Sequence, residues 1–264
     1  MTYEDPLDTE RLRAELAAAD SLWRTAEVLP EAGSTNAELA ARARAGEPAG
    51  LVLATDHQTA GRGRLGRTWT APAGSSIAMS VLLQPTRDPA GWTWLPLLAG
   101  LAVADSLRAV ADVPAVLKWP NDVLVDGAKI CGILAERVDT TGGPLCVLGM
   151  GINVHLTAAE LPVPTATSLA VLRPDQRPVR AEIMATVLAA LALLYHRWED
   201  GRDAELSREY EARCDTLGRA VRVQHADGST TEGEAVGIDA DGRLQVRTKA
   251  GQQTFAAGDV VHLR

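Results

Sequence analysis

The sequence predicts an α+β protein, in which one large domain with a mixed β-sheet and flanking helices is followed by a small β-barrel. The 264 residues, 46% of them hydrophobic, suffice for a domain with a sizeable core. Stretches with the apolar period of helices alternate with short apolar runs bounded by turn residues, which are typical of strands. After Gly218 the composition shifts to short alternating runs. We therefore expect residues 1–216 to form the large domain and residues 217–264 the barrel.

The first half of the large domain is predicted to contain three helices and two strands. In the second helix, Thr35 and Glu38 have the spacing of a T-x-x-E capping box, and Gly46 ends the run. In the third helix, Pro96 lies in the first turn and Pro114 closes the region. The predicted segments are helices over 8–19, within 33–46 and around Pro96, and strands over 51–56 and 76–84.

Further along the chain, the same patterns predict three strands, a loop and two helices. The first two strands are joined by a turn at Asp126–Gly127, and the loop contains two prolines and no period. In the barrel, Ala-Asp-Gly triplets at 226–228 and 240–242 are hairpin-turn signals. The predicted segments are two strands within 116–138, one over 144–156, an irregular loop over 158–168, an amphipathic helix over 180–199 and a charged helix ending near Cys214.

The composition argues against several classes of protein. A formal charge of −8 does not favour long-range attraction to nucleic acid. The charged N-terminus and the lack of an apolar run of about 18 residues argue against a signal peptide and a membrane span, so we expect a cytoplasmic protein. Three cysteines without a C-x-x-C pair fit a reducing compartment. The five histidines show no metal-ligand spacing, and no zinc is expected.

The stretch HQTAGRGRLGRTW, residues 57–69, has the G-x-G-x-x-G spacing of a dinucleotide site. Such a site needs a helix that starts at the glycines, whereas Pro72 and Gly74 follow here. The stretch also lacks the lysine and the helix of a P-loop. It is therefore either a solvated surface loop or a glycine-rich loop that binds anions and stacks on a ring. The residues suited to the second role are Arg62, Arg64, Arg67 and Trp69.

A second motif, KWPNDVLVDGAKICGIL at residues 118–134, narrows the interpretation. Together the two stretches resemble the biotin–protein ligases, in which a G-R-G-R-x-G-R-x-W loop and a K-W-P-N-D segment followed by K-x-x-G-I-L line one site. GSTN at 33–36, Gln58 and GMGINV at 149–154 extend the resemblance to nearly all of residues 30–264. The resemblance implies an α+β catalytic domain related to the class II aminoacyl-tRNA synthetases, with an SH3-like barrel behind it.

The resemblance also implies a reaction and a set of site residues. Biotin would be joined to AMP from ATP, with Mg²⁺ as the companion of ATP, and the biotinyl group would pass to a lysine of a biotin carboxyl carrier domain of acetyl-CoA or acyl-CoA carboxylase. Lys129, Arg62 and Arg64 would be catalytic, because cations stabilise charge that builds when two anions meet. The residues implied to hold biotin are Ser34, Thr35, Asn36, Gln58, Arg62, Gly63, Arg64, Lys129 and Gly132. Those implied to meet the nucleotide are Arg67, Trp69, Lys118, Asn121, Asp122 and Asn153.

Several alternatives stay open at this point. Thr35 taken alone is more typical of a helix cap, and Trp119 beside Pro120 of a packed bend. Asp122 suits the nucleotide, the magnesium or the incoming lysine. The alternative functions are a lipoate or octanoate ligase of the same fold and a non-catalytic biotin-binding regulator. About thirty residues precede Gly33, too few for a winged helix-turn-helix domain, so we expect ligase activity without a nucleic-acid partner. We also expect no membrane partner, and a monomer or a ligand-linked homodimer.

Overall fold

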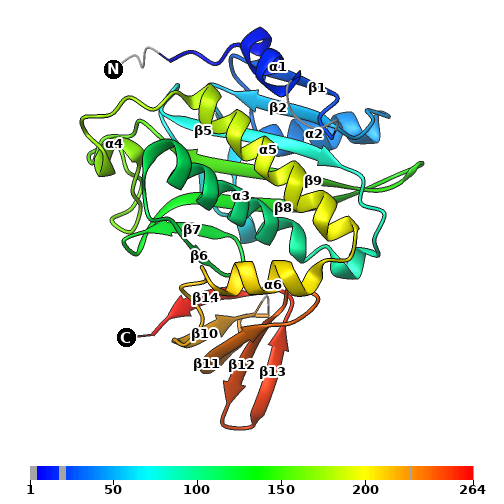
Figure 1. Cartoon of the computed structure of the whole chain (residues 1–264), viewed down its shortest axis with the longest axis vertical. Helices are drawn as coiled ribbons and strands as arrows, with labels where there is room; N and C mark the ends of the chain where they lie inside the picture. Colours follow the sequence, from blue (N-terminus) through cyan, green and yellow to red (C-terminus); the bar gives the residue numbers. More distant parts are fainter. Residues whose placement is uncertain (1–4, 18–21, 226, 264) are drawn as a thin grey trace.

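A mixed seven-stranded β-sheet forms the centre of the large domain (Figure 1). In the computed structural model, which describes residues 5–17, 22–225 and 227–263, the strand order is β1-β2-β5-β9-β8-β7-β6. β1 and β2 are parallel, and all other neighbours are antiparallel. The strands are β1 (Thr25–Leu29), β2 (Leu51–Thr55), β5 (Ser76–Leu83), β6 (Val116–Lys118), β7 (Asp122–Val125), β8 (Ala128–Thr140) and β9 (Gly143–Asn153).

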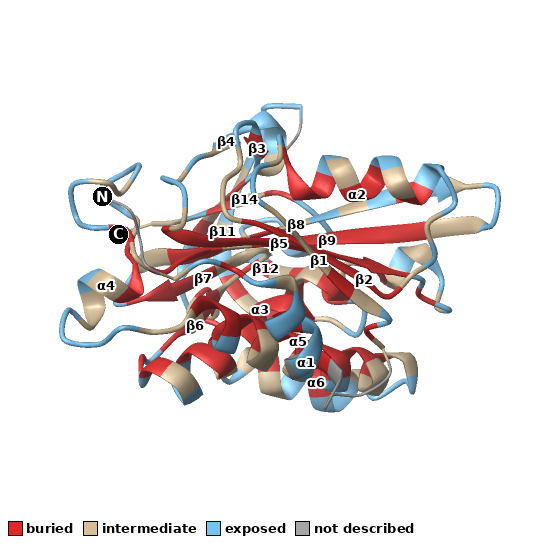
Figure 2. Cartoon of the chain, turned by 90° about the horizontal axis from the view of Figure 1, so that it is seen from above, coloured by how far each residue is buried: buried red, intermediate tan, exposed pale blue. Residues whose placement is uncertain are grey.

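Helices cover the two faces of this sheet unequally. Figure 2 shows α2 and the β3–β4 hairpin on one face, and α1, α3, α5 and α6 on the other. The main core lies under the larger group of helices, whereas α2 buries a smaller cluster that includes Leu39 and Ala43. The elements are α1 (Thr9–Ala17), α2 (Thr35–Arg44), β3 (Gly61–Arg62), η1 (Arg64–Gly66), β4 (Thr68–Trp69), η2 (Pro89–Gly91), α3 (Trp94–Ala111), α4 (Leu169–Leu172), α5 (Arg180–Glu199) and α6 (Asp203–Glu211).

The third predicted helix is long and strongly apolar. By length and composition alone the segment Pro89–Ala111 could cross a membrane, with a mean hydropathy of 1.4. Its leucines, among them Leu97, Leu98 and Leu101, are buried in the main core, where α3 packs on α5 and β8. This burial identifies α3 as a core helix, and Pro96 lies in its first turn as the sequence predicts.

The C-terminal part forms a separate five-stranded antiparallel sheet, which lies below α6 in Figure 1. The turn predicted at 240–242 connects β11 to β12, and the turn predicted at 226–228 lies between β10 and β11, with Ala226 outside the described residues. The apolar pattern misses β13, because only Phe255 of this strand is buried. The strands are β10 (Ala220–Gln224), β11 (Thr230–Ile238), β12 (Leu244–Thr248), β13 (Gly251–Phe255) and β14 (Asp259–His262).

Three further details correct the sequence-based predictions, and a fourth prediction falls partly outside the described residues. Residues 116–138 form three strands rather than two, because a turn at 119–121 pairs Lys118 with Asp122. The half-buried β1 lacks the apolar run that would predict it. Ser34 rather than Thr35 caps α2, since the Ser34 hydroxyl accepts from the Ala37 N–H at 3.4 Å. α1 ends at Ala17, and residues 18 and 19 of the predicted helix lie outside the described residues.

Candidate active site

A cavity of about 260 Å³ opens on the face of the sheet that α2 covers only in part. Its walls come from the start of α2, the central strands, the β3–β4 hairpin and the C-terminal sheet, which contributes Asp259 and Val260. Nearly all of the residues implied by the sequence motifs meet here. Those that line the cavity are Ser34, Thr35, Asn36, Gln58, Arg62, Gly63, Arg64, Arg67, Trp69, Lys118, Asn121, Asp122, Lys129 and Gly132.

Glycines form the floor of the cavity where β8 pairs with β9. Gly132 lies opposite Gly151 in the ladder, and the indole of Trp69 rests against both. A methyl group on Gly151 would lie 2.7 Å from the indole, and one on Gly132 would lie 3.3 Å from it. At Gly149 an added methyl would lie 2.0 Å from the amide oxygen of Asn36. The glycines therefore let side chains lie directly on the sheet backbone.

Hydroxyl and amide groups form one end of the cavity. Gln58 Oε1 accepts from the backbone N–H of Thr35 at 2.8 Å and from its hydroxyl at 3.2 Å. The buried hydroxyl of Ser80 lies 2.7 Å from Thr35 Oγ1 and donates to Asn36 Oδ1 at 2.6 Å. Because Ser34 caps the helix, the Thr35 hydroxyl joins this network, and the interpretation of Thr35 as a helix cap is wrong.

The GRGRLGRTW stretch folds as a β-hairpin. Gly61 pairs with Trp69, and the Arg67 N–H donates to the Arg64 carbonyl at 3.2 Å across a turn at Leu65–Gly66. Both turn residues are left-handed, with φ of 53° and 72°, as a type I′ hairpin turn requires. The hairpin directs all three arginines to the cavity. The stretch therefore lines the cavity, while Arg62 and residues 65–68 are also exposed to solvent.

Arg64 is the most firmly held of these arginines. Its Nη1 donates to Asn121 Oδ1 at 3.0 Å, and its Nη2 donates to the Gly258 carbonyl at 3.3 Å. Asn121 is itself fixed, because its amide donates to the Ile133 carbonyl at 2.9 Å. Burial lowers the pKa of Arg64, but a guanidinium stays charged at physiological pH. Asn121 thus lines the cavity itself and also holds Arg64 in place.

The other two arginines contact carboxylates. Arg62 Nη2 lies 3.1 Å from Glu136 Oε2, and Arg67 pairs with Asp259 at the start of β14. Guanidinium groups recognise carboxylate and phosphate oxygens alike. Both arginines therefore line the cavity with groups that can bind an anion.

Two lysines and one carboxylate lie beside the hairpin. Lys129 Nζ is 2.5 Å from Asp122 Oδ1. Burial lowers the pKa of Lys118. The nearby charges of Lys129 and Arg67 lower this pKa further, whereas the carboxylate of Asp122 raises it. This corner of the cavity therefore concentrates positive charge, which the carboxylates of Asp122 and Asp215 offset only in part. Such a corner suits a polyanion such as a nucleotide phosphate.

Residues 158–168 hold the backbone of Lys129. The Lys129 N–H donates to the Thr165 carbonyl at 2.8 Å, and the Thr167 N–H donates to the Lys129 carbonyl at 2.9 Å. Asn153 does not line the cavity: it is 3% exposed, and its amide donates to the Thr167 carbonyl at 2.9 Å. Asn153 therefore anchors this loop, and its implied contact with the nucleotide stays a prediction. The packed bend inferred for Trp119 is confirmed, because its ring is buried and donates to the Gly242 carbonyl.

Two family models match the chain. The biotin/lipoate A/B protein ligase family matches residues 33–153, and the biotin protein ligase C terminal domain matches residues 216–263. The biotin–[acetyl-CoA-carboxylase] ligase of Mycobacterium tuberculosis is 42% identical over 267 residues, which cover 98% of this chain and 97% of that protein. The chain belongs to the biotin protein ligase family.

Another relative and a solved structure agree with this membership. The biotin–[acetyl-CoA-carboxylase] ligase of Paracoccus denitrificans is 34% identical over 88% of this chain and 98% of its own. The structure of the biotin protein ligase from Aquifex aeolicus in complex with biotin and ATP has a TM-score of 0.79 at 28% identity, covering 92% of this chain and all of that one. The resemblance that the motifs indicate is thereby confirmed.

In this biotin protein ligase family member, three residues outside the motifs contact the residues that line the cavity. Two serines stand in the apolar run SIAMSVLL, and the inner one, Ser80, is a sequence signal for a buried polar contact. Glu136 follows Leu134 by two residues in a strand, so it shares the face of the sheet. Asp259 gives no such signal, because its contact joins two sheets that are distant in sequence.

Proposed function

We propose that this family member uses ATP to convert biotin to biotinyl-5′-AMP, releases pyrophosphate, and transfers the biotinyl group to a lysine of a biotin carboxyl carrier domain of acetyl-CoA or acyl-CoA carboxylase. The observation that carries the proposal is the convergence of two lysines and three arginines on a slot with a glycine floor and a hydroxyl–amide end. The names of the relatives, and the Aquifex structure with biotin and ATP, support the same assignment.

The hydroxyl–amide end suits the ureido ring of biotin. Hydroxyl and amide groups both donate and accept hydrogen bonds, as the ureido carbonyl and N–H groups require. The glycines leave space for the rest of the molecule, and its carboxylate then meets cations from the hairpin and from β8. The residues assigned to biotin are Ser34, Thr35, Asn36, Gln58, Arg62, Gly63, Arg64, Lys129 and Gly132.

The nucleotide belongs to the opposite part of the cavity. The indole of Trp69 offers a flat face for adenine, and Arg67 and Lys118 offer charge for the phosphates. Asn121 contributes by orienting Arg64, and Asp122 by orienting Lys129.

Two displacements make up the reaction. A carboxylate oxygen of biotin attacks the α-phosphorus of ATP, and the bond to the bridging oxygen breaks as pyrophosphate leaves. Lys129 and Arg64 stabilise the negative charge that builds as the two anions meet. The neutral amine of the carrier lysine then attacks the acyl carbon, AMP leaves with the electron pair of the broken C–O bond, and the amine loses its proton.

Magnesium enters this proposal as the companion of ATP. Within the described ranges, no group of three or more His, Cys, Asp or Glu side chains could enclose a metal ion. Asp122 and Asp259 are separate carboxylates, each paired with a cation. They fit an ion that takes most of its oxygen ligands from phosphates and water, with Asp122 as its protein ligand. Bound Mg²⁺ would neutralise phosphate charge.

The remaining assignments concern the fold and the surroundings. We assign residues 1–216 to a catalytic domain related to the class II aminoacyl-tRNA synthetases and residues 217–264 to an SH3-like barrel, which the mixed sheet and the five antiparallel strands support. The charge of −8 supports the absence of a nucleic-acid partner. The burial of α3 supports the absence of a membrane partner, and three buried free cysteines support a cytoplasmic location. We expect a monomer or a ligand-linked homodimer.

Exchange of labelled pyrophosphate into ATP tests the activation step. With purified protein and Mg·ATP, we expect exchange that depends on biotin and does not occur with lipoate. Exchange with lipoate alone would establish the lipoate alternative. Binding of biotin without any exchange would establish the non-catalytic regulator.

A further inference from the structure

The carboxylate of Glu136 lies at the junction between the polar end of the cavity and the arginine hairpin. Its Oε2 accepts from Asn36 Nδ2 at 2.8 Å and from Arg62 Nη2 at 3.1 Å. Asn36 Nδ2 also donates to the Leu134 carbonyl at 3.1 Å, so the amide is fixed to β8 at two points. One oxygen atom of Glu136 therefore joins two groups that belong to different parts of the site.

This oxygen completes a chain of hydrogen bonds across the cavity wall. Asn36 Oδ1 accepts from Ser80, Ser80 contacts Thr35, and Thr35 donates to Gln58. The chain thus runs from the ureido end of the proposed biotin pocket to the guanidinium of Arg62. Ser80 is fully buried, so the middle of this hydrogen-bond chain is shielded from water. Hydrogen bonds are electrostatically stronger in such an interior than in water.

Glu136 holds Arg62 from outside the cavity. Arg62 and Leu134 line both the main cavity and a second hollow beside the hairpin, whereas Glu136 lines the second hollow and not the main cavity. The side chains of Arg62 and Glu136 are 46% and 31% exposed. Solvent screens a pair this exposed, and such pairs add little to the stability of a fold. The contact matters instead for the direction of the guanidinium, because Arg62 donates to an oxygen that the Asn36 amide also holds in place.

We propose that Glu136 is a positioning residue for the activation step, which directs Arg62 toward the carboxylate of biotin and links it to the ring pocket through Asn36. The role rests on the proposed function. It requires no contact between Glu136 and either substrate. It predicts that removing the Glu136 carboxylate impairs the use of biotin through Arg62 and leaves the use of ATP nearly unchanged.

The test measures biotin-dependent pyrophosphate exchange in Glu136→Gln and Glu136→Ala. The matched control is Asp139→Asn, which removes another carboxylate of β8, one that pairs with Arg137 at the exposed end of the strand. We expect kcat/KM for biotin to fall about tenfold in Glu136→Ala, which is typical of the loss of one charge-assisted contact. We expect the KM for ATP and the melting temperature to stay close to those of Asp139→Asn.

A double-mutant cycle with Arg62→Ala separates positioning from a general structural role. If Glu136 acts through Arg62, Glu136→Ala costs less than about twofold once Arg62 is absent. If Glu136→Ala lowers kcat/KM for biotin equally with and without Arg62, the role is refuted. It is also refuted if both Glu136→Gln and Glu136→Ala have the same kcat/KM for biotin as Asp139→Asn. Glu136→Gln keeps the shape of the side chain, so it tests the role even if the alanine variant folds poorly. A wild-type protein inactive with biotin would instead overturn the proposed function, and this role with it.

Discussion

Gly149→Ala places a single methyl group beneath the polar end of the cavity. The new carbon would lie 2.0 Å from Asn36 Oδ1, whereas ordinary contacts begin at 3.4 Å, so the amide must move by about 1.4 Å. A shift of that size breaks the hydrogen bonds of Asn36 to Ser80, Leu134 and Glu136. At about 1 kcal/mol net for each bond, we expect a loss of about 3 kcal/mol.

Thermal unfolding and calorimetric binding of biotin measure this loss. For a chain of this size, about 3 kcal/mol corresponds to a fall in Tm of about 6–12 °C. The matched control is Gly142→Ala in the turn between β8 and β9, where the nearest atom to an added methyl is 3.8 Å away. We expect the control to stay within about 0.5 kcal/mol of wild type.

The double variant Asn36→Ala, Gly149→Ala completes the test. Removing the amide removes the clash, so the added methyl should have little effect in the Asn36→Ala background. If Gly149→Ala matches Gly142→Ala in both Tm and biotin affinity, the close packing of Asn36 on the glycine floor is refuted.

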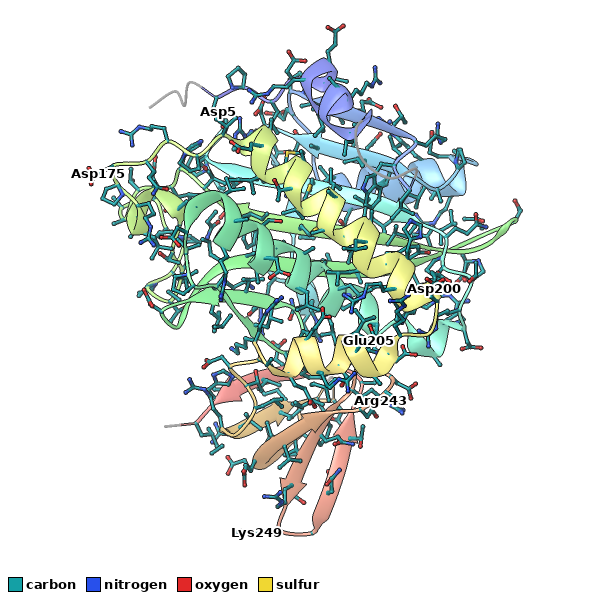
Figure 3. The ribbon with its side chains drawn as sticks, viewed as in Figure 1. Asp5, Asp175, Asp200, Glu205, Arg243 and Lys249 are labelled. Atoms are coloured by element: carbon teal, nitrogen blue, oxygen red, sulfur yellow. The ribbon has the colours of Figure 1, made fainter. Side chains whose placement is uncertain are left out.

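Three further variants test other parts of the site. Lys129→Ala should lower the rate of biotin-dependent pyrophosphate exchange at least about a hundredfold, because a donor aimed at developing charge is lost; an unchanged rate would exclude that role. Gly151→Ala pushes a methyl to within 2.7 Å of the Trp69 ring and should raise the KM for ATP about tenfold, the cost of a lost stacking contact, whereas Gly142→Ala should leave that KM unchanged. Lys118→Met should raise Tm at neutral pH and lower activity. Burial lowers the pKa of Lys118, so its charged form destabilises the fold at every pH below that lowered pKa. In the wild type this destabilisation should disappear as pH rises from the lowered pKa toward 10.5. Lys249→Met, at the exposed hairpin tip in Figure 3, is its control and should change neither property.

Local patterns predict the fold wherever burial follows the period of an element. β5 is buried throughout and α3 over most of its length, and their sequences show it. β1 and β13 bury one residue each, so they carry no apolar pattern and form only because a neighbouring strand supplies hydrogen bonds. The cap of α2 shows a further limit, since Ser34 and Thr35 are both good caps and only the contact of Thr35 with Gln58 decides between them.

The motifs predict which residues line the cavity better than they predict what those residues touch. Glycines and charged side chains in GRGRLGRTW and KWPND are short-range signals. The contacts of Glu136 and Asp259 are long-range, and Asn36 and Glu136 are 100 positions apart in the chain. Asn153 shows the reverse case: it stands in a motif, but its amide is used to hold a loop. Such pairings depend on how the sheet brings strands together, which no single stretch of sequence contains.

The most direct test of the central claim is the mass of an unmodified biotin carboxyl carrier domain after incubation with the protein, Mg·ATP and equal amounts of biotin and lipoate. We predict a gain of one biotinyl group, which requires ATP and disappears when the acceptor lysine of the carrier is changed to arginine. A lipoyl gain, or no gain from a protein that still binds biotin, would contradict the assignment of this chain as a biotin protein ligase.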